Sequence, residues 1–365
     1  GGHGHGRGKH ARYLAVGTLG NGICTVNPGR TTGATSTQHA TSSAPGHAAG
    51  MHSAVVLQSH LGKVTAVATH PNLNQYATVA TDRTIKLWDA DKQTLLATGR
   101  LREFGSCVCY HPNGSVVAVG THNGEVAIME AIKASHGWAW HTKSRRNIGT
   151  KIRNLPEDGA GGRKGGKAPK PERNELDNVH AADVEPSQRF CELRDIKFSP
   201  DGSILAVASK DTNIYLLDVT QNYRKLGVLK GHSTFVSHID FNWNGTVLQS
   251  NDASKEILYW DLTTYKQHSS AFGLRDEKWA TWTCPLGWAV HGIWENNYTG
   301  GDYDISAIAR SHSSNVVCAG GSYKSVKLFP FPALPDYESR TFYAHAASPA
   351  GMAFLHDDKK MVSPW

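Results

Sequence analysis

The sequence predicts an all-β fold, a WD-repeat β-propeller, and three observations support that prediction. A unit returns several times along the 365 residues, and its best copies end in an apolar run followed by Trp88-Asp89 and Trp260-Asp261. About thirty residues separate the His near the start of each of these copies from its Trp-Asp, which is the repeat length of a propeller blade. Each unit reads as a small antiparallel sheet, and neighbouring units in a ring would cover both of its faces.

Five fuller copies and two partial ones can be followed in order. The fuller copies span residues 63–89, 107–129, 194–218, 232–261 and 305–329, and the partial ones span 13–26 and 350–365. In turns such as Ser199-Pro200-Asp201-Gly202, Pro or Asn presets one backbone angle and Gly takes a positive φ. The tally predicts about seven blades, with six as the alternative if the first and last pieces share a blade.

The best copy also predicts a buried chain of hydrogen bonds, which stabilises a blade when every member is satisfied. Its members are His60, Thr78, Asp82 and Trp88. A catalytic dyad of His60 and Asp82 is the other interpretation, but the pattern partly recurs at His232 and Trp260, and repetition favours a structural role. In that second copy Ser254 stands six residues before the Trp, where the first copy has Asp82, so we expect an incomplete network there.

Positive charge is concentrated in one segment between two blades. Residues 133–173 carry eleven Lys and Arg against three Asp and Glu, a net charge of +8, whereas the whole chain carries +7. Such localised charge predicts docking on an anionic surface. We therefore assign residues 133–190 to a basic insert, although its part 159–171 is equally well explained as a solvated loop. The residues expected to contact a partner are Trp138, Trp140, Lys143, Arg145, Arg146, Lys151 and Arg153.

Composition assigns the remaining segments. Residues 11–132 and 191–365 form the propeller, 1–10 a low-complexity tail, and 27–53 a flexible loop within the ring. The tail carries three His that can chelate a metal weakly, but low complexity explains them better, so we expect no metal or cofactor. Gly161 to Lys167 has the spacing of a phosphate-binding loop, but Ala168 replaces the required Ser or Thr and Pro169 opposes the following helix.

The most specific stretch runs from Asp276 to Trp294 and reads DEKWATWTCPLGWAVHGIW. Together with HSTFVSHIDF, EILYWDL, HPNGSVVAVGT and FSPDGSILAVASKDTNIYLLDV, it resembles the echinoderm microtubule-associated protein-like family, above all the C-terminal propeller of that family. The resemblance covers residues 55–131 and 192–365, and residues 13–26 fit the blade that enters the propeller. We expect the Trp residues of the first stretch to pack in the core rather than to form a ligand cage.

This resemblance implies a non-catalytic scaffold that binds microtubules or tubulin. Composition alone leaves acidic tubulin surface, nucleic acid and anionic membrane open as partners of the insert. The resemblance favours tubulin, while the insert matches no nucleic-acid-binding module and lacks the period of a membrane helix, so neither nucleic acid nor membrane is expected. The expected location is the cytoplasm and cytoskeleton, with a ciliary or flagellar axoneme and its proteins as the assembly.

Two other classes of function remain as alternatives. The first is a WD-repeat adaptor that recruits protein partners, for instance as the substrate receptor of a ubiquitin ligase. The second is an enzyme built on the propeller, with convergent polar groups in its central channel. The sequence contains neither a Gly-x-Ser-x-Gly nor a His-Glu-x-x-His motif, so we expect no enzyme.

Overall fold

Strands make up most of the ordered secondary structure in the computed structural model, which describes residues 15–19, 22–26, 59–149, 191–294, 304–322, 324–335, 337–343 and 345–364. These residues form 24 strands and two short 3₁₀ helices, η2 (Phe272–Leu274) and η3 (Trp288–Ile293). Neither helix approaches the length that a membrane crossing would need, and none of the described residues forms a longer one.

Five four-stranded sheets are each built from consecutive strands that run antiparallel to one another. Their strands are β3 (Val64–Thr69), β4 (Gln75–Ala80), β5 (Thr84–Asp89), β6 (Thr94–Arg100), β7 (Gly105–Tyr110), β8 (Val117–Thr121), β9 (Glu125–Ala134), β10 (Gly137–Asn147), β11 (Leu193–Phe198), β12 (Ile204–Ser209), β13 (Asn213–Asp218), β14 (Arg224–Lys230), β15 (Val236–Phe241), β16 (Val247–Asp252), β17 (Ile257–Asp261), β18 (Lys266–Gln267), β19 (Ile305–Arg310), β20 (Val316–Gly321), β21 (Val326–Pro330) and β22 (Arg340–Phe342). The first three strands of each sheet coincide with one of the five fuller copies predicted from the sequence.

A further sheet combines segments from opposite ends of the chain. It contains β1 (Ala15–Leu19), β2 (Gly22–Val26), β23 (Ala353–Phe354) and β24 (Met361–Val362) in the order β2-β1-β24-β23. β1 pairs with β24 in parallel, whereas the other pairings in this sheet are antiparallel. The two partial copies thus share one sheet. The described residues contain six four-stranded sheets, and the expectation of about seven blades is wrong.

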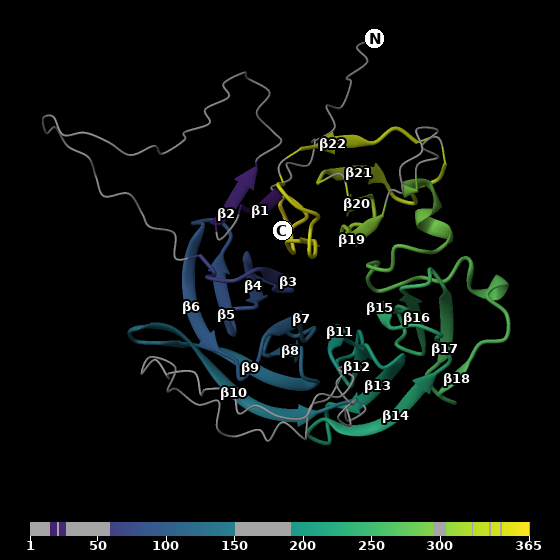
Figure 1. Ribbon diagram of the computed structural model, residues 1–365, viewed down its shortest axis with the longest axis horizontal. Helices are drawn as coiled ribbons and strands as arrows, with labels where there is room; N and C mark the ends of the chain where they lie inside the picture. The colour runs from purple at the N-terminus through teal and green to yellow at the C-terminus, as the bar shows by residue number, and fades with distance from the viewer. Residues whose placement is uncertain are drawn as a thin grey trace, which may run out of the picture.

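The sheets are arranged around a centre toward which their first strands face (Figure 1). Contacts link β3 to β7, β7 to β11, and β11 to β15, and on the other side β19 to β23 and β23 to β3. This is the arrangement of a propeller, in which each sheet is one blade. The sheets from β15 to β18 and from β19 to β22 are instead separated by a segment that belongs to no sheet.

Each blade buries both of its faces, because side chains alternate along a strand. In β12, Leu205 and Val207 enter the cluster shared with the blade of β7 to β10, while Ala206 and Ala208 enter the cluster shared with the blade of β15 to β18. All four residues are completely buried. The runs of consecutive apolar residues in the middle strands therefore reflect two-sided burial within the ring.

The segment 268–294 fills the space between two blades. The backbone of Ala280 donates to the carbonyl of Phe241 in β15, and the backbone of Gly292 donates to the carbonyl of Ala333, which follows β21. Asp240, also in β15, accepts hydrogen bonds from the backbone amides of Thr283 and Cys284 at 2.7 and 2.9 Å. The segment is hydrogen-bonded to both blades. It therefore closes the ring between them in place of a contact between their first strands, β15 and β19. We call it the bridging segment.

The predicted turns have the expected backbone. Gly114, Gly202 and Gly245 have φ values of 77°, 76° and 70°, which favour glycine. At Gly202 space is restricted as well, since a Cβ there would lie 2.3 Å from the Nε2 of His111 in the preceding blade. The turn glycine is therefore required both by the local backbone and by the packing of one blade on the next.

The position of the basic insert differs from the sequence prediction. Residues 133–147 are not part of an insert: β9 continues to Ala134, and β10 pairs with it over Gly137–Asn147 as the outer strand of a blade. Residues 1–10 and 27–53, and the part of the insert from residue 150 to 190, lie outside the described residues.

Candidate partner-binding surfaces

The network predicted in the blade of β3 to β6 is continuous in the structure. The His60 Nδ1 lies 3.0 Å from a carboxylate oxygen of Asp82, and its Nε2 lies 2.7 Å from the Thr78 hydroxyl oxygen. The indole N–H of Trp88 donates to the same hydroxyl at 2.8 Å. Thr84 adds a contact that the sequence analysis did not include, because its hydroxyl lies 3.0 Å from His60 Nδ1 and donates to Asp82.

This geometry favours the structural interpretation of His60 and Asp82 over the catalytic one. Both ring nitrogens of His60 contact protein groups, and the imidazole is almost completely buried. Burial alone would raise the pKa of Asp82, but hydrogen bonds from His60, Thr84 and the Leu61 amide lower it further than burial raises it. The carboxylate is therefore held ionised as an acceptor within the blade, and neither ring nitrogen of His60 faces open space where a substrate could bind.

The corresponding network in the blade of β15 to β18 is only partly formed. The His232 Nε2 lies 2.6 Å from the Ser250 hydroxyl oxygen, to which the Trp260 indole N–H donates at 2.8 Å. The Nδ1 of His232 has no hydrogen-bond partner among the described residues. The substitution at Ser254 thus coincides with a gap in the network, although Asp252 lies nearby at 3.5 Å.

β10 presents the part of the predicted binding surface that the structure describes. Trp138 and Trp140 pair with Lys133 and Ala131 of β9. Trp140 packs against the core cluster between the blades of β3 to β6 and β7 to β10, and it lies over Gly99 of β6. The packing of Trp140 supports a structural role rather than the expected role as an anchor for a partner. Trp138 is only partly buried.

The basic side chains of β10 are also engaged within the protein. Lys143 forms an ion pair with Glu130 at 3.0 Å, and Arg145 forms one with the buried Glu125 at 2.5 Å. Arg146 donates to the carbonyl of Asn222 in the next blade at 2.9 Å. These contacts tie β10 to its blade and to a neighbour. Of the predicted contact residues, Lys151 and Arg153 lie outside the described residues.

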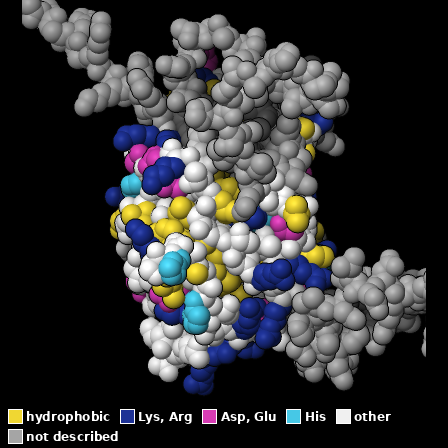
Figure 2. Space-filling model, turned by 90° about the vertical axis from the view of Figure 1, so that its left-hand side faces the viewer, with side chains coloured by type: hydrophobic (Ala, Val, Ile, Leu, Met, Phe, Trp, Pro, Cys, Tyr) yellow, Lys and Arg dark blue, Asp and Glu magenta, His cyan; other side chains and the backbone are white. Residues whose placement is uncertain are grey.

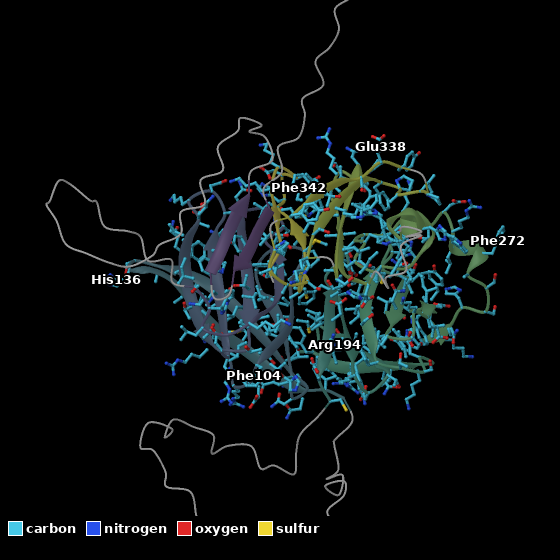
Figure 3. The ribbon with its side chains drawn as sticks, turned by 45° about the horizontal axis from the view of Figure 1, so that its top comes forward. Phe104, His136, Arg194, Phe272, Glu338 and Phe342 are labelled. Carbon is cyan, nitrogen blue, oxygen red and sulfur yellow. The ribbon has the colours of Figure 1, made fainter. Side chains whose placement is uncertain are left out.

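The hairpin of β9 and β10 still offers an exposed basic edge. Lys133, His136 and His141 are exposed, as is Ile132 at 45 %. Figure 3 shows His136 at the tip of the hairpin, directed away from the ring. On this side of the molecule, Lys and Arg side chains gather around an apolar area (Figure 2). We call residues 132–143 of this hairpin the basic edge.

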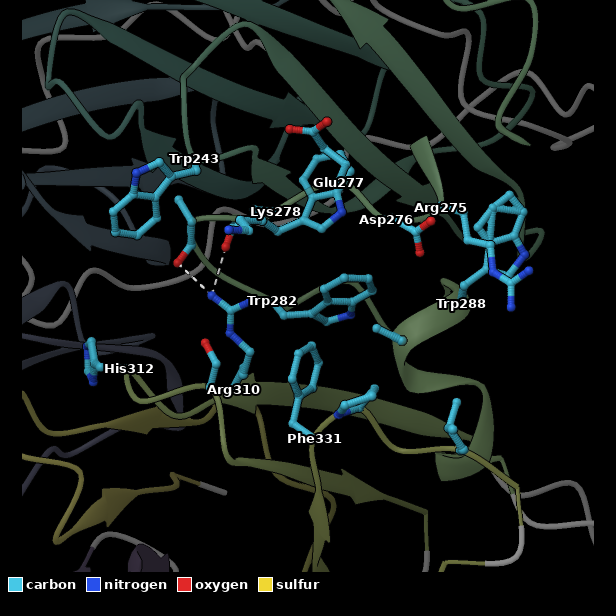
Figure 4. Close-up of a pocket in the computed structure, with 16 residues that line it drawn as sticks. Trp243, Arg275, Asp276, Glu277, Lys278, Trp282, Trp288, Arg310, His312 and Phe331 are labelled. Atoms are coloured by element: carbon cyan, nitrogen blue, oxygen red, sulfur yellow. Dashed lines mark hydrogen bonds between the residues drawn. The ribbon is translucent and has the colours of Figure 1, made fainter. Parts of the chain in front are cut away.

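A second candidate surface is a pocket of about 900 Å³ beside the bridging segment. Five of its sixteen lining residues are Trp or Phe, and Trp243 and Trp288 are 66 % and 40 % exposed at its margin (Figure 4). Within the pocket, the Arg310 guanidinium donates to the carbonyl oxygens of Trp279 and Ala280 at 2.8 and 3.0 Å. It also lies 5.2 Å from the ring centroid of Phe331. Exposed aromatic rings around a fixed cation are typical of protein-binding surfaces.

Sequence reasoning missed this pocket. Trp279 and Trp282 are buried, as expected for core packing, but Trp288 is not. Trp243 occupies the turn between β15 and β16 and is exposed. A large aromatic residue in a predicted turn is the sequence signal that could have indicated this surface. The remaining walls come from segments more than thirty residues apart, such as Arg275 and Leu334, which only the fold brings together.

Comparison with known proteins gives matches over most of the chain. A family model described as the echinoderm microtubule-associated protein second β-propeller matches residues 160–364, and the WD domain, G-beta repeat model matches residues 52–89. Human echinoderm microtubule-associated protein-like 3 is 31 % identical over 313 residues, which is 84 % of this chain and 30 % of that protein. Human echinoderm microtubule-associated protein-like 2 is 30 % identical over 85 % of this chain and 41 % of that protein.

A relative from Xenopus tropicalis, echinoderm microtubule-associated protein-like 4, is 30 % identical over 85 % of this chain and 29 % of its own length. The chain thus spans less than half of the length of each of these three relatives. The bridging segment and the strands from β11 to β24 lie within the matched range of the propeller model. On these matches, the chain belongs to the echinoderm microtubule-associated protein family and contains the second β-propeller of that family.

Proposed function

We propose that this chain is a non-catalytic WD-repeat scaffold that binds microtubules through its basic edge and the positively charged residues that follow it. Family membership is the observation that carries the proposal, since the names of the relatives describe them as microtubule-associated. The charge distribution supports it, because the net charge of +8 in residues 133–173 lies next to an exposed hairpin. Basic side chains around partly exposed Trp138 and Ile132 suit an acidic tubulin surface.

In the proposed mechanism, the ring holds the hairpin in place and the exposed charges of the basic edge contact the microtubule. The blades hold β10 rigidly through the Arg145–Glu125 pair and the Arg146 contact to Asn222. Lys133, at the exposed end of β9, forms no ion pair with a described acidic residue. Lys151 and Arg153 follow further along the sequence and add positive charge. Binding that depends on such exposed charge weakens as salt screens it.

Co-sedimentation with stabilised microtubules across a salt series tests this proposal. Deleting residues 136–173 would remove β10 and damage a blade, so charge reversal is the better variant. The test variant carries Lys133→Glu, Lys151→Glu and Arg153→Glu. The matched control carries Lys225→Glu, Lys230→Glu and Lys266→Glu, which change the net charge equally at exposed positions on β14 and β18.

We expect salt-sensitive pelleting of the unmodified chain and of the control, and loss of pelleting in the test variant. Equal loss in both variants would mean that total charge, rather than the basic edge, drives binding. Pelleting that survives in both would move the contact to another face of the ring. If the unmodified chain fails to pellet at any salt concentration, the scaffold proposal is wrong.

We place the scaffold in the cytoskeleton, and more specifically in a microtubule-based assembly such as the ciliary axoneme, with axonemal proteins as further partners. Imaging of the tagged chain in ciliated cells checks the finer location, because enrichment along axonemes distinguishes it from general cytoplasmic microtubules. Partners that are nucleic acids or membranes are not part of the proposal. A gel-shift experiment with duplex DNA at the salt concentration of the pelleting assay tests the first of these.

A protein-recruiting adaptor is the second candidate function, and the aromatic pocket is the observation that favours it. Trp243 and Trp288 leave apolar surface exposed beside Arg310, on a part of the ring distant from β10 in Figure 1. An adaptor would bind its folded partner through this face and would be insensitive to the charge reversals. Loss of partner binding in a Trp243→Ser and Trp288→Ser variant that still pellets would assign recruitment to the pocket.

A further inference from the structure

The gap in the second network lies among three groups with the chemistry of metal ligands. His232 precedes β15, Asp252 is the last residue of β16, and Glu256 immediately precedes β17. The His232 Nδ1 lies 3.5 Å from an oxygen of Asp252 and 3.6 Å from an oxygen of Glu256. One ligand atom from each of the three residues lies within 4.8 Å of the other two.

Two of these atoms lack the partners that burial normally requires. The His232 side chain is 1 % exposed, yet its Nδ1 has no hydrogen bond among the described residues, and the same holds for Glu256 Oε2, which is itself buried. Buried polar atoms of this kind are rare and ask for an explanation. Here both atoms point into the same space, so one missing group would satisfy them together.

The orientation of the imidazole suits a ligand. The Nε2 of His232 contacts the Ser250 hydroxyl, and that hydroxyl donates to the carbonyl of Leu258 while accepting the Trp260 indole N–H. In this arrangement Nε2 carries the proton and donates to Ser250, which leaves a lone pair on Nδ1. Metal-binding His residues are commonly fixed in this way by a hydrogen bond from their other ring nitrogen.

The charge of the cluster also favours a cation, in addition to the hydrogen bonds that Asp252 accepts from Thr234, Ser254 and the Glu256 amide. Among the described residues, neither Asp252 nor Glu256 forms an ion pair with a Lys or Arg, and both lie beside His232 Nδ1. With Nε2 donating to Ser250, the two carboxylates face the lone pair on His232 Nδ1 at 3.5 and 3.6 Å.

Alignment with the blade of β3 to β6 shows how this composition arose. In both blades the His and the hydroxyl residue are 18 positions apart, and the hydroxyl residue and the Trp are 10 apart. In this register Ser254 replaces Asp82, while Glu256 replaces Thr84, the hydroxyl beside His60 Nδ1. The first blade thus has a hydrogen-bonded His60–Asp82 pair at 3.0 Å, whereas the second blade has two carboxylates at 3.5 and 3.6 Å from the His232 Nδ1.

We propose that His232 Nδ1, Asp252 and Glu256 bind one divalent transition-metal ion, and that Zn²⁺ is the ion. One imidazole nitrogen with two carboxylate oxygens is a donor set that Zn²⁺ accepts, and a nitrogen donor disfavours Ca²⁺ and Mg²⁺. Ligands about 2.0–2.2 Å from a tetrahedral zinc ion are about 3.4 Å apart, close to the 3.5 and 3.6 Å that separate His232 Nδ1 from the oxygens of Asp252 and Glu256. The Glu256 side chain is 40 % exposed, which gives the ion a path from solvent.

The test compares Zn²⁺ binding to the full chain and to a Glu256→Gln variant after treatment with EDTA. Glu256 is the ligand most exposed to solvent, and its buried Oε2 has no hydrogen bond among the described residues, so this variant should fold normally. A Glu338→Gln variant is the matched control, because Glu338 is exposed and lies in another blade region. His3, His5 and His10 are present in all three proteins, so any zinc that they chelate cancels in the comparison.

We expect isothermal titration to show one more equivalent of Zn²⁺ bound by the unmodified chain and the control than by Glu256→Gln, or an affinity at that site lower by at least about tenfold in the variant. Zn²⁺ should raise the melting temperature of the first two proteins and not that of the variant, because an ion bound only by the folded state stabilises it. Substitution with Co²⁺ provides an independent readout through the visible absorption of a four-coordinate site.

Equal stoichiometry and affinity in all three proteins, together with an unchanged melting temperature on addition of Zn²⁺, would overturn the proposal. In that case the zinc bound by each protein belongs to the His-rich tract. If Glu256→Gln is already unfolded in EDTA, a Glu256→Ser variant replaces it, since a hydroxyl restores the residue type found at Thr84 in the other blade. Retention of the additional equivalent by that variant would equally overturn the site.

Discussion

The blades of β3 to β6 and β15 to β18 share their spacing but differ in how they satisfy one buried histidine. His60 has a carboxylate and a hydroxyl at its Nδ1, whereas the Nδ1 of His232 has two carboxylates at 3.5 and 3.6 Å and no hydrogen bond among the described residues. Both Trp residues donate to the hydroxyl of the central Thr or Ser. The shared spacing therefore fixes the contacts among the His Nε2, the hydroxyl and the Trp indole. The residues of the turn between the second and third strands decide whether the His Nδ1 also gains a hydrogen bond.

The largest expected effect comes from opening the closed network. Asp82→Ala removes the acceptor for His60, for the Thr84 hydroxyl and for the Leu61 amide, and it leaves the buried His60 ring without its carboxylate partner. We expect a loss of about 3 kcal/mol in the free energy of unfolding, measured by urea denaturation. Asp304→Ala, at an exposed position, serves as the control and should change stability by less than about 0.5 kcal/mol. A similarly small effect at Asp82 would show that the network contributes little.

The two histidines should differ when each is removed in the presence of EDTA. His60→Ala breaks contacts at both ring nitrogens, whereas His232→Ala breaks the one hydrogen bond to Ser250. We therefore expect His60→Ala to be more destabilising than His232→Ala by about 1 kcal/mol. Urea denaturation of both variants measures the difference, and equal losses would contradict the assignment of one closed and one open network.

The acid dependence of stability should report on the closed network. The pKa of Asp82 is lowered in the folded protein, so its contribution is fully present above the unfolded value of about 3.9 and is lost as the pH falls toward the lowered folded value. The difference in stability between the unmodified chain and Asp82→Asn should thus shrink as the pH falls from 6 to 3. Urea denaturation at several pH values checks this, and other carboxylates cancel in the difference. A constant gap would mean that Asp82 is not preferentially ionised in the fold.

The smallest expected effect is that of Glu256→Gln without metal. Removing one of two carboxylates beside a neutral imidazole relieves repulsion, so stability in EDTA should stay the same or rise by up to about 0.5 kcal/mol. Differential scanning fluorimetry and urea denaturation are sufficient to detect the sign. A clear loss of stability would indicate that Glu256 instead pairs with a protonated His232, which would make the second blade resemble the first.

The positions of the blades were predictable because local sequence determines them. Alternating apolar residues and turns such as His111-Pro112-Asn113-Gly114 locate the strands, and positive φ at Gly114 is as expected. The partners of His60 were also predictable, since they stand at fixed distances along the chain from one another. The sequence left the count of blades between seven and six, because only the fold shows that the two partial copies share a sheet and that the apolar bridging segment forms none.

The basic insert was misplaced for a different physical reason. Residues 137–147 alternate between more and less exposed positions, as is typical of an outer strand. Their positive charge favoured an insert over a strand in the prediction from sequence. Arg145 is charged yet structural, because it pairs with the buried Glu125 inside the same blade. Charge composition alone cannot separate such an intramolecular pair from a surface charge. The aromatic pocket was out of reach as well, since its walls meet only after the ring closes.

The sheet shared by β1 and β24 gives the ring a mechanical property. Two residue pairs, Ala15 with Met361 and Val16 with Val362, join these strands in parallel. The other described sheets consist of strands joined in sequence, so tension along the chain reaches them only after this pairing has yielded. A chain pulled by its two ends would therefore yield first at this pairing, and its resistance to load depends on a few backbone hydrogen bonds rather than on the size of its core.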